Sequence, residues 1–443
     1  MSEPRNEYVE YLRATPDRWA KVKMRDVGRI VSGGTPSRDA PSLWGGGIPW
    51  VTPGELTSLP TKEISDTNET ISKSGLAGSG ANLLPEKSLL ITSRATLGSR
   101  AVNTVPMATN QGFKSLVPFN RQVTDYLYHL FEKIKPELVR RASGTTFLEI
   151  SGSEFGEIDL PLPEMKEAVK IAEILDTLDA AIRGTEAVVA KLRAVKQGLL
   201  HDLLTRGIDA NGDLRPPHPE APHLYKQTPL GWLPKEWDVL EIQDMLAAVD
   251  PAMRSGPFGS ALLKEELVSA GIPFLGIDNV FVESFDRNYK RFVTPRKFLQ
   301  LSRYAVRSDD LMITIMGTVG RCCLVPADVG KAISSKHTWT ISLDQLKYSP
   351  YLAMLQVNYS DWVLRHFSKD QQGGTMSAIR SETIRSTRLP VPPREEQDSI
   401  EAILVELSNR LREEETMLKK FRLQKSGLMD DLLTGRVPVT PLL

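Results

Sequence analysis

Three stretches of this 443-residue chain hold residue types that can do chemistry. Gly45–Gly47 could cradle a phosphate, Lys336-His337 could supply a general base, and Glu413–Glu415 could bind a metal ion. The glycines also suit a turn, no nucleophile or carboxylate can be placed beside His337, and the glutamates fit a solvated helix face. The sequence has no Walker A motif, no Asp/Asn-Pro-Pro-Tyr/Phe motif and no Gly-x-Gly-x-x-Gly between a strand and a helix. We therefore expect no catalytic residue, no metal site and no cofactor in this chain.

Cations and small polar residues give a second kind of signal, for nucleic acid. Residues 287–307 hold seven cations and no acidic residue. Cations neutralise phosphates, whereas the four interleaved aromatic residues of this run fit a protein core better than base stacking. Loops rich in Gly, Thr and Ser offer amides and hydroxyls to phosphate oxygens, although each loop alone could be an ordinary turn. Four such loops recur, at Gly33–Ser37, Ser143–Thr146, Ser255–Ser260 and Gly373–Thr375.

A repeated helical segment must position these loops. KQGLLHDLLTRGI begins at Lys196 and KSGLMDDLLTGRV begins at Lys425, 229 positions later, and the match runs without a gap from Thr146/Thr375 to Leu204/Leu433. Apolar residues in each copy are spaced 4,3,4,3, which is typical of a helix that packs along another helix. The predicted seam consists of Ile171, Leu175, Leu178, Ile182, Leu192, Leu199, Leu203, Ile400, Leu404, Leu407, Leu411, Leu418, Phe421, Leu428 and Leu432.

Both copies interrupt the seam at equivalent places, Thr185/Glu414 and Lys196/Lys425. A polar residue in a seam can fix the register and the partner of a helix. Alternatively, these side chains sit at the edge of the seam and reach solvent. The two helices can pair parallel, with the flanking domains at one end, or antiparallel, with the domains at opposite ends about a pseudo-twofold axis. A helix of about 35–40 residues would be roughly 50–60 Å long.

Looser repeats ahead of each helix indicate two globular domains. Trp19 corresponds to Trp237, and residues 48–51 correspond to residues 272–275. Short β-rich runs at 88–93 and 310–315, with helical patterns near 124–140 and 349–367, indicate mixed α/β domains. The boundaries we predict are 1–159 for the first domain, 160–208 for the first helix, 209–236 for a proline-rich linker, 237–388 for the second domain, 389–437 for the second helix and 438–443 for a tail.

The composition of the chain indicates where in the cell the protein acts. Apolar residues make up 41% of the chain and charged residues 25%, a normal globular mixture. No apolar run approaches the ~18 residues of a membrane span, and the first residues are polar. The only cysteines are the adjacent Cys322 and Cys323, which provide no disulfide framework. We expect a cytoplasmic protein. The net charge of zero does not exclude nucleic acid, because binding depends on where charges lie.

Taken together and in order, these segments resemble the specificity (S) subunits of type I restriction–modification systems, from about Trp19 to Val437. The segments that carry the resemblance are Gly34–Ser37, Ile48–Val51, Asn110–Phe113, Gly198–Thr205, Gly256–Ser260 and Gly427–Thr434. The resemblance implies an α+β fold. Two mixed α/β target recognition domains would be separated by two long helices that form an antiparallel coiled coil, as a pseudo-twofold internal repeat.

The resemblance also implies a function and partners. Each domain would read one half of a split double-stranded DNA target, and the paired helices would set the gap between the halves. Two modification subunits would dock on the repeated helices and methylate adenine with S-adenosylmethionine, and restriction subunits would add an ATP- and Mg-dependent nuclease. This chain would be non-catalytic. Arg206-Gly207 is inverted to Gly435-Arg436, so the two helix ends need not make identical contacts.

On this basis we expect DNA contacts on the loops of both domains. In the first domain the candidates are Thr35, Ser37, Arg94, Thr96, Asn110, Gln111, Lys114 and Thr145. In the second domain they are Ser255, Ser260, Thr318, Arg321, Ser335, Lys336, His337 and Thr375. Such side chains can read a base edge or hold a phosphate. Two alternatives remain, a stand-alone DNA-binding regulator and a coiled-coil scaffold that binds no DNA.

Overall fold

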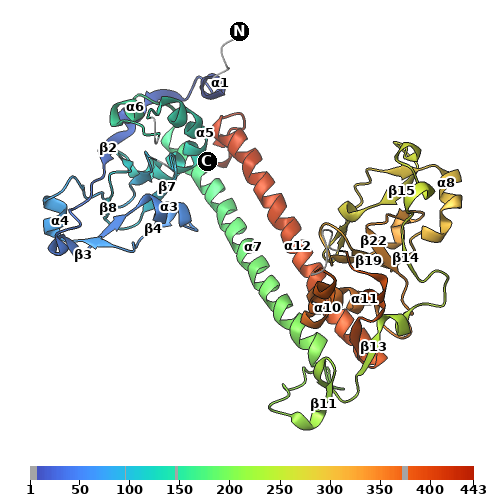
Figure 1. The fold of residues 1–443 in the computed structure, drawn as a ribbon. Coiled ribbons are helices and arrows are strands. Elements are labelled where there is room, and N and C mark those ends of the chain that lie inside the picture. Colours follow the sequence, from blue (N-terminus) through green and yellow to red (C-terminus); the bar gives the residue numbers. More distant parts are fainter. Residues whose placement is uncertain (1–6, 95, 145–147, 372–377) are drawn as a thin grey trace. The chain divides into compact units, whose positions relative to one another are not determined.

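The computed structural model describes residues 7–94, 96–144, 148–371 and 378–443 (Figure 1). The chain forms two compact units. Unit 1 comprises Met1–Ala187 and Thr416–Leu443, and unit 2 comprises Val188–Glu415. Each unit therefore contains one globular domain together with half of each long helix. None of the helices in the described ranges is both long enough and apolar enough to cross a membrane.

Unit 1 is built on a five-stranded sheet in the order β2-β9-β6-β7-β4 and a three-stranded sheet in the order β5-β3-β8. The strands of the larger sheet are β2 (Gly28–Ser32), β4 (Glu63–Ile64), β6 (Leu89–Ile91), β7 (Arg100–Asn103) and β9 (Lys114–Pro118). The smaller sheet consists of β3 (Trp44–Val51), β5 (Thr70–Ile71) and β8 (Ala108–Thr109). The helices are α1 (Glu7–Ala14), α2 (Met24–Val27), α3 (Pro53–Ser58), α4 (Lys73–Ala77), α5 (Thr124–Arg141) and α6 (Gly152–Gly156).

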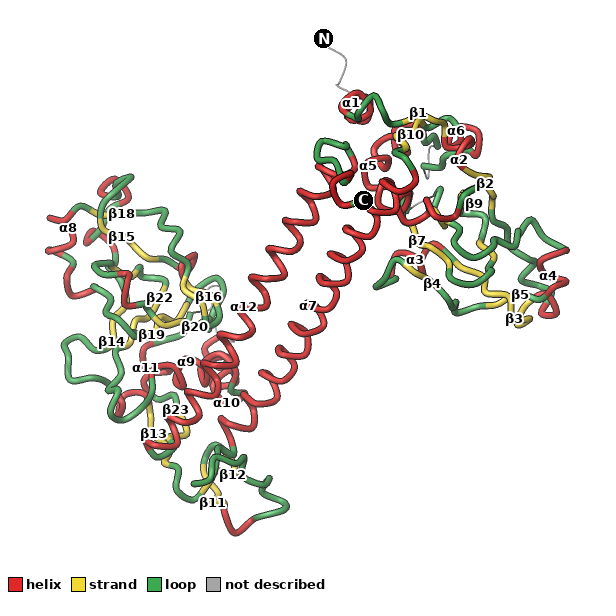
Figure 2. The backbone as a smooth tube through the Cα atoms, turned by 180° about the vertical axis from the view of Figure 1, so that it is seen from behind, coloured by secondary structure: helices red, strands yellow, loops and turns green. Residues whose placement is uncertain are grey.

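Unit 2 likewise contains one larger sheet and one three-stranded sheet (Figure 2). Its four-stranded sheet consists of β14 (Met253–Ser255), β22 (Thr338–Ile341), β19 (Leu311–Thr314) and β20 (Cys322–Leu324). Its three-stranded sheet consists of β18 (Phe292–Val293), β15 (Ile272–Leu275) and β21 (Ile333–Ser334). A hairpin is formed by β16 (Val280–Phe281) and β17 (Ser284–Phe285). The helices are α8 (Pro295–Gln300), α9 (Pro350–Tyr359), α10 (Asp361–Gln371) and α11 (Ser381–Arg385).

An antiparallel strand pair joins the start and the end of each domain. In unit 1, β1 (Ala20–Lys23) pairs with β10 (Asp159–Leu162). In unit 2, β13 (Asp238–Glu241) pairs with β23 (Arg388–Val391). Prolines are tolerated in these two-stranded sheets because each strand has a free edge. The proline-containing segments that repeat ahead of the helices are thus strands of the domains, and the helices begin later than we predicted, at Met165 and Arg394.

The two long helices are α7 (Met165–Thr205) and α12 (Arg394–Leu433). Within unit 1 they run antiparallel, because Asp179 pairs with Lys425 and Glu186 pairs with Arg422. Every predicted seam residue is buried or half-buried, as a two-helix interface requires. Among the polar seam positions, Lys425 crosses to the other helix, where its Nζ lies 2.5 Å from Asp179. This contact favours a register-fixing role over simple exposure.

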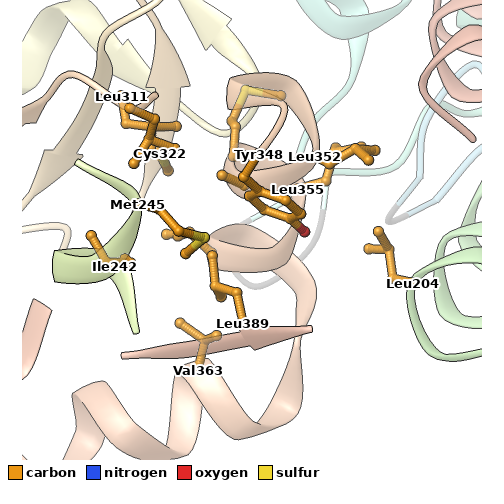
Figure 3. Close-up of a cluster of buried hydrophobic side chains, with 14 of the residues drawn as sticks. Leu204, Ile242, Met245, Leu311, Cys322, Tyr348, Leu352, Leu355, Val363 and Leu389 are labelled. Carbon is orange, nitrogen blue, oxygen red and sulfur yellow. The ribbon is translucent and has the colours of Figure 1, made fainter. Parts of the chain in front are cut away.

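The ends of the long helices contribute buried residues to the apolar core of each unit. In unit 1, Ile171 and Leu175 of α7 share a cluster with Leu432 and Leu433 of α12. In unit 2, Leu203 and Leu204 at the end of α7 share a cluster with residues of α9, α10 and β23, several of which Figure 3 shows. In each unit, a globular domain and both long helices therefore share one buried core.

A tryptophan–glutamate bond repeats in both cores. Trp19 Nε1 donates to Glu167 at 3.1 Å, and Trp237 Nε1 donates to Glu396 at 3.0 Å. A glycine with positive φ, beyond the end of the other copy's helix, packs on each indole: Gly435 (φ +67°) on Trp19 and Gly207 (φ +63°) on Trp237. In both copies the glycine adopts the left-handed conformation that commonly ends a helix. The inversion of Arg-Gly to Gly-Arg shifts this glycine by one residue between the copies.

The predicted linker at 209–236 is not an unstructured connector. It contains the hairpin of β11 (Tyr225–Thr228) and β12 (Gly231–Pro234), and Leu233 is buried in the unit 2 cluster. Arg215 of this segment pairs with Glu396 at the start of α12. Proline content predicted a break in the helices correctly, but it did not reveal that the segment packs on unit 2.

Candidate nucleic-acid interface

Each unit has a short parallel strand pair whose carboxyl end carries predicted DNA-contact residues. In unit 1, β3 pairs with β8, and Asn110 N donates to Val51 O at 3.1 Å just beyond the pair. In unit 2, β15 pairs with β21, and Ser335 N donates to Leu275 O at 2.8 Å. The two backbone arrangements are equivalent, so Asn110 corresponds to Ser335.

A glycine clamps a second loop against each of these strand ends. Gly256 N donates to Ser335 O at 3.1 Å, and a Cβ on Gly256 would lie 2.1 Å from Ser334 O. A Cβ on Gly33 would lie 1.9 Å from Asn110 O. No side chain fits at such distances, so both loops depend on glycine for their close approach.

A third loop joins the same place in both units. Ser93 N donates to Gly112 O at 2.7 Å, and Ile315 N donates to His337 O at 3.0 Å. Each loop is closed by a threonine hydroxyl, from Thr92 to Thr96 O and from Thr314 to Thr318 O. Three segments distant in sequence therefore converge in each unit. We call these sites polar edge 1 (residues 33–37, 93–94, 96 and 110–112) and polar edge 2 (residues 255–260, 315–318 and 335–337).

Most of the predicted unit 1 residues lie on polar edge 1. The Thr35 hydroxyl donates to Gln111 Oε1, and Asn110 Oδ1 accepts from Gly112 N at 2.8 Å. Ser37 and Thr96 are exposed there, and the guanidinium of Arg94 lies 3.9 Å from the Glu149 carboxylate. Lys114 is half-buried on β9 opposite Ser32, at the margin of this edge. Thr145 lies outside the described residues.

On polar edge 2 the predicted residues differ in exposure. Lys336 is exposed and His337 is half-buried, whereas Ser335 is only 3% exposed. Ser260 and Thr318 are exposed, and Ser255 is buried, with its hydroxyl 3.4 Å from Lys336 O. Arg321 lies at the far end of its loop, over the Phe281 ring at 5.5 Å, and so does not join the other candidates. Thr375 is not among the described residues.

A hollow of about 380 Å³ adjoins polar edge 2. Its lining includes Ser335, His337, Met316 and Arg291. Burial, together with the positive charges of Lys336 and Arg291, lowers the pKa of His337. The imidazole is therefore neutral at pH 7, and one ring nitrogen can donate while the other accepts. Its Nδ1 lies 3.4 Å from Met316 Sδ.

Sequence reasoning missed two arginines beside the edges. Arg291 belongs to the cation-rich run at 287–307 but was not selected, and its guanidinium pairs with Asp278. Arg38 directly follows Ser37, packs 3.9 Å above the Trp44 ring and donates to Glu69 at 2.9 Å. This hydrogen bond lowers the pKa of Glu69. Adjacency to a selected loop residue was the available signal for Arg38.

Pairing with carboxylates accounts for much of the cation-rich run. Arg287 pairs with Asp328 at 2.8 Å, and Lys297 pairs with Glu266 at 2.6 Å. Aromatic residues of the run pack on buried apolar clusters, namely Tyr289, Phe298 and Tyr304. The run is thus chiefly structural, as the core interpretation of its aromatic residues predicted.

One cluster in the described residues has metal-ligand types, His129, Asp176 and Asp179. Its carboxylates already accept from lysines, with Lys62 Nζ 2.5 Å from Asp176 and Lys425 Nζ 2.5 Å from Asp179. Burial alone would raise the pKa of Asp176, but the hydrogen bonds from His129 and Lys62 outweigh burial and lower it. These contacts make the cluster an ion-pair network that ties the unit 1 domain to α7.

In unit 2, an ion pair likewise connects α7 to the globular domain. Lys196, the other lysine of the seam, extends to the β16–β17 hairpin, where its Nζ lies 2.6 Å from Glu283 Oε2. Tyr359 also donates to Glu283. A cavity of about 690 Å³ lies between α7 and the start of α10, lined by Lys196, His201 and Trp362 among others.

The fold and the duplicated polar edges define a protein with two similar globular domains that share two long helices. Comparison with known protein families identifies the family. The type I restriction modification DNA specificity domain matches residues 16–193 and 234–420. The chain therefore belongs to the family of type I restriction–modification specificity subunits, which are non-catalytic.

Relatives support this assignment along the whole chain. The Type I restriction enzyme MjaIX specificity subunit of Methanocaldococcus jannaschii is 24% identical over 442 residues, covering 96% of this chain and 95% of the relative. The EcoR124I/EcoR124II specificity subunit of Escherichia coli is 27% identical over 35% of this chain and 39% of its own length. The crystal structure of an S subunit from M. genitalium has the same fold, with a TM-score of 0.58, 13% identity and 98% coverage of both chains.

Proposed function

We propose that this chain selects a bipartite double-stranded DNA target, with polar edge 1 reading one half-site and polar edge 2 reading the other. The observation that carries this proposal is a shared backbone with different side chains. Asn110-Gln111 and Ser335-Lys336 occupy equivalent strand ends, yet they offer different donors and acceptors. A duplicated frame with divergent polar groups is suited to reading two unlike half-sites.

The repeated helices provide the second part of the function. Their apolar seam is used inside the chain, but Val188 and Val195 of α7 and Met417 and Leu423 of α12 remain 39–66% exposed. We infer that the exposed apolar side chains of the helices help to dock two modification subunits that methylate adenine, and that restriction subunits join the complex. S-adenosylmethionine, ATP and Mg²⁺ would be bound by those partners, and the complex would act in the cytoplasm.

Mapping adenine methylation across a genome tests this function. Cells would carry the modification subunit with or without this chain, and single-molecule sequencing would read the methylated positions. A split motif methylated only in the presence of the chain is the expected result. Unchanged methylation would contradict the proposal, and duplex binding by the purified chain would then separate a stand-alone regulator from a scaffold.

Two single substitutions assign the half-sites. Gln111→Ala removes a base-reading group from polar edge 1, so discrimination should relax by about 1–3 kcal/mol in one half of the motif only. Lys336→Ala removes a charge from polar edge 2, so binding should weaken and its salt dependence should become less steep. If Gln111→Ala altered both halves equally, the one-edge-per-half assignment would be wrong.

A further inference from the structure

The aromatic side chain of Phe258 stands in solvent on polar edge 2. It is 62% exposed, although Pro257 immediately before it is buried. Among the phenylalanines that the structure describes, Phe281 is less exposed, at 42%, and Phe119 is more exposed, at 73%. Phe119 lies in unit 1 just past the end of β9 that pairs with Gly28, at the opposite end from Lys114 and polar edge 1. Phe258 is therefore an exposed apolar group on an edge whose other exposed side chains, those of Ser260, Thr318 and Lys336, are polar.

The loop that carries Phe258 is held firmly on both sides. Before it, Gly256 is bonded to Ser335 O and is too close to Ser334 for any side chain. After it, a short 3₁₀ turn begins at Gly259, and Ala261 N donates to Phe258 O at 3.2 Å. A backbone held in this way loses little conformational freedom on binding, which favours presentation of the ring to a partner.

The charges around Phe258 indicate the kind of partner. Exposed Lys336 belongs to the same edge, and Arg291, which pairs with Asp278, lines the adjacent hollow. Cations beside a projecting apolar ring suit duplex DNA, in which charged phosphates flank bases that are stacked through their flat, apolar faces. DNA-bending proteins use phenylalanine in this way, as a wedge between base steps.

Unit 1 has a different group at the equivalent position. Counting from the clamped glycines Gly33 and Gly256, Thr35 corresponds to Phe258. Thr35 is half-buried, and its hydroxyl is bonded to Gln111. The duplicated frame thus presents a polar residue on one edge and a projecting ring on the other.

We propose that the Phe258 ring inserts between neighbouring base pairs of the half-site read by polar edge 2, whereas no side chain inserts into the half-site read by polar edge 1. The inference rests on the proposed function, because it assumes that both edges contact DNA. It adds that the two half-sites are read by different means. The second half-site would be selected in part by how easily one of its base steps opens.

The test uses the complex of this chain with its modification subunit and the target found by methylation mapping. The adenine analogue 2-aminopurine, whose fluorescence is quenched by stacking, would be placed in turn along both half-sites. A methyltransferase itself extrudes the adenine that it methylates, so those positions are left out of the comparison. At the remaining positions we expect a several-fold rise at one step of the second half-site and none in the first. Phe258→Thr, which copies unit 1, should abolish the rise and weaken binding about tenfold. Phe258→Leu should retain most of both, and Thr35→Ala should leave the signal unchanged.

The outcomes separate the two proposals. A specifically methylated target that binds with no fluorescence rise, or with a rise that survives Phe258→Thr, would overturn the wedge and leave the specificity function intact. Loss of subunit assembly in Phe258→Thr, measured by size-exclusion chromatography, would also overturn it, because the ring would then face protein. If no target is methylated, both proposals fail. Circular dichroism of each variant, and binding to DNA with only the first half-site intact, would show that the variants are folded.

Discussion

Glu396 holds four segments of unit 2 together. Its carboxylate accepts from Trp237 Nε1 at 3.0 Å and from Ile208 N at 2.9 Å, and it pairs with Arg215. The side chains of Glu396 and Arg215 are only 8% and 11% exposed. These contacts join the start of α12 to the end of α7, to the 209–236 segment and to the first strand of the domain.

Glu396→Ala should therefore be strongly destabilising. Removing one partner of a buried ion pair costs about 3–5 kcal/mol, because the other charge stays buried without compensation. The orphaned Trp237 and Ile208 donors add to this loss, although such terms do not sum fully. We expect a loss of about 4 kcal/mol in unit 2. Glu396→Gln keeps the volume and one acceptor oxygen, and should lose about half as much.

Glu167 in unit 1 is the matched control. It accepts from Trp19 at 3.1 Å, but its cation, Arg18, is 47% exposed and can return to water. An exposed partner contributes only about 0–1 kcal/mol, and an orphaned Trp19 donor about 1–3 kcal/mol. We therefore expect Glu167→Ala to cost about 2 kcal/mol, roughly half of the cost at Glu396.

Native-state hydrogen exchange measures the two units separately, because it reports local opening free energies within one protein. Glu396→Ala should speed exchange in peptides covering residues 204–216 and 233–242 and leave residues 16–24 unaffected. Glu167→Ala should do the reverse. The double variant Glu396→Ala/Arg215→Ala should recover part of the loss, since no buried charge remains. Equal losses in both units, or a loss at Glu396 below about 1 kcal/mol, would refute this reasoning.

Three further predictions follow from the helices and the cysteines. Gly198→Ala and Gly427→Ala should each stabilise the chain by about 1 kcal/mol in thermal unfolding, because both glycines lie inside helices with open space around the added methyl group. Gly207→Ala should instead destabilise the chain, since its φ is +63° and the methyl group would meet Trp237. Similar effects at all three positions would contradict this prediction. Burial raises the pKa of Cys323 to about 12 and also raises the pKa of Cys322, so neither thiol should react with Ellman's reagent at pH 8 until guanidinium unfolds the protein. Rapid labelling of the native chain would contradict this expectation. Inserting two heptads into both α7 and α12 should lengthen the gap between the recognised half-sites by about 6 base pairs, because 14 residues at ~1.5 Å correspond to about 21 Å. Insertion into one helix alone should disrupt the pairing of the two helices. An unchanged gap in the methylated motif would contradict the spacer function.

Local patterns in the sequence determined the frame of this protein. The heptad spacing predicted two long helices and their buried faces, since contacts between residues three and four apart repeat along a helix regardless of the surroundings. Every predicted seam residue is buried or half-buried. The duplication likewise predicted two domains with a common plan, and the strands at Leu89–Ile91 and Leu311–Thr314 lie where the β-rich runs indicated.

Tertiary structure alone decided which polar side chains meet. Thr35 and Gln111 are 76 positions apart and touch because Gly34 N donates to Thr109 O at 2.9 Å. Thr109 ends β8, which pairs with β3 through only two residues of each strand. Pairing of such short strands depends on distant chain segments and leaves no periodic signal. The same reason hid the partners of Lys196 and Glu396, the hairpin at 225–234 and the exposure of Phe258. The sequence thus determined the helices and the repeat through local periodicity, while long-range packing decided the surface of each polar edge.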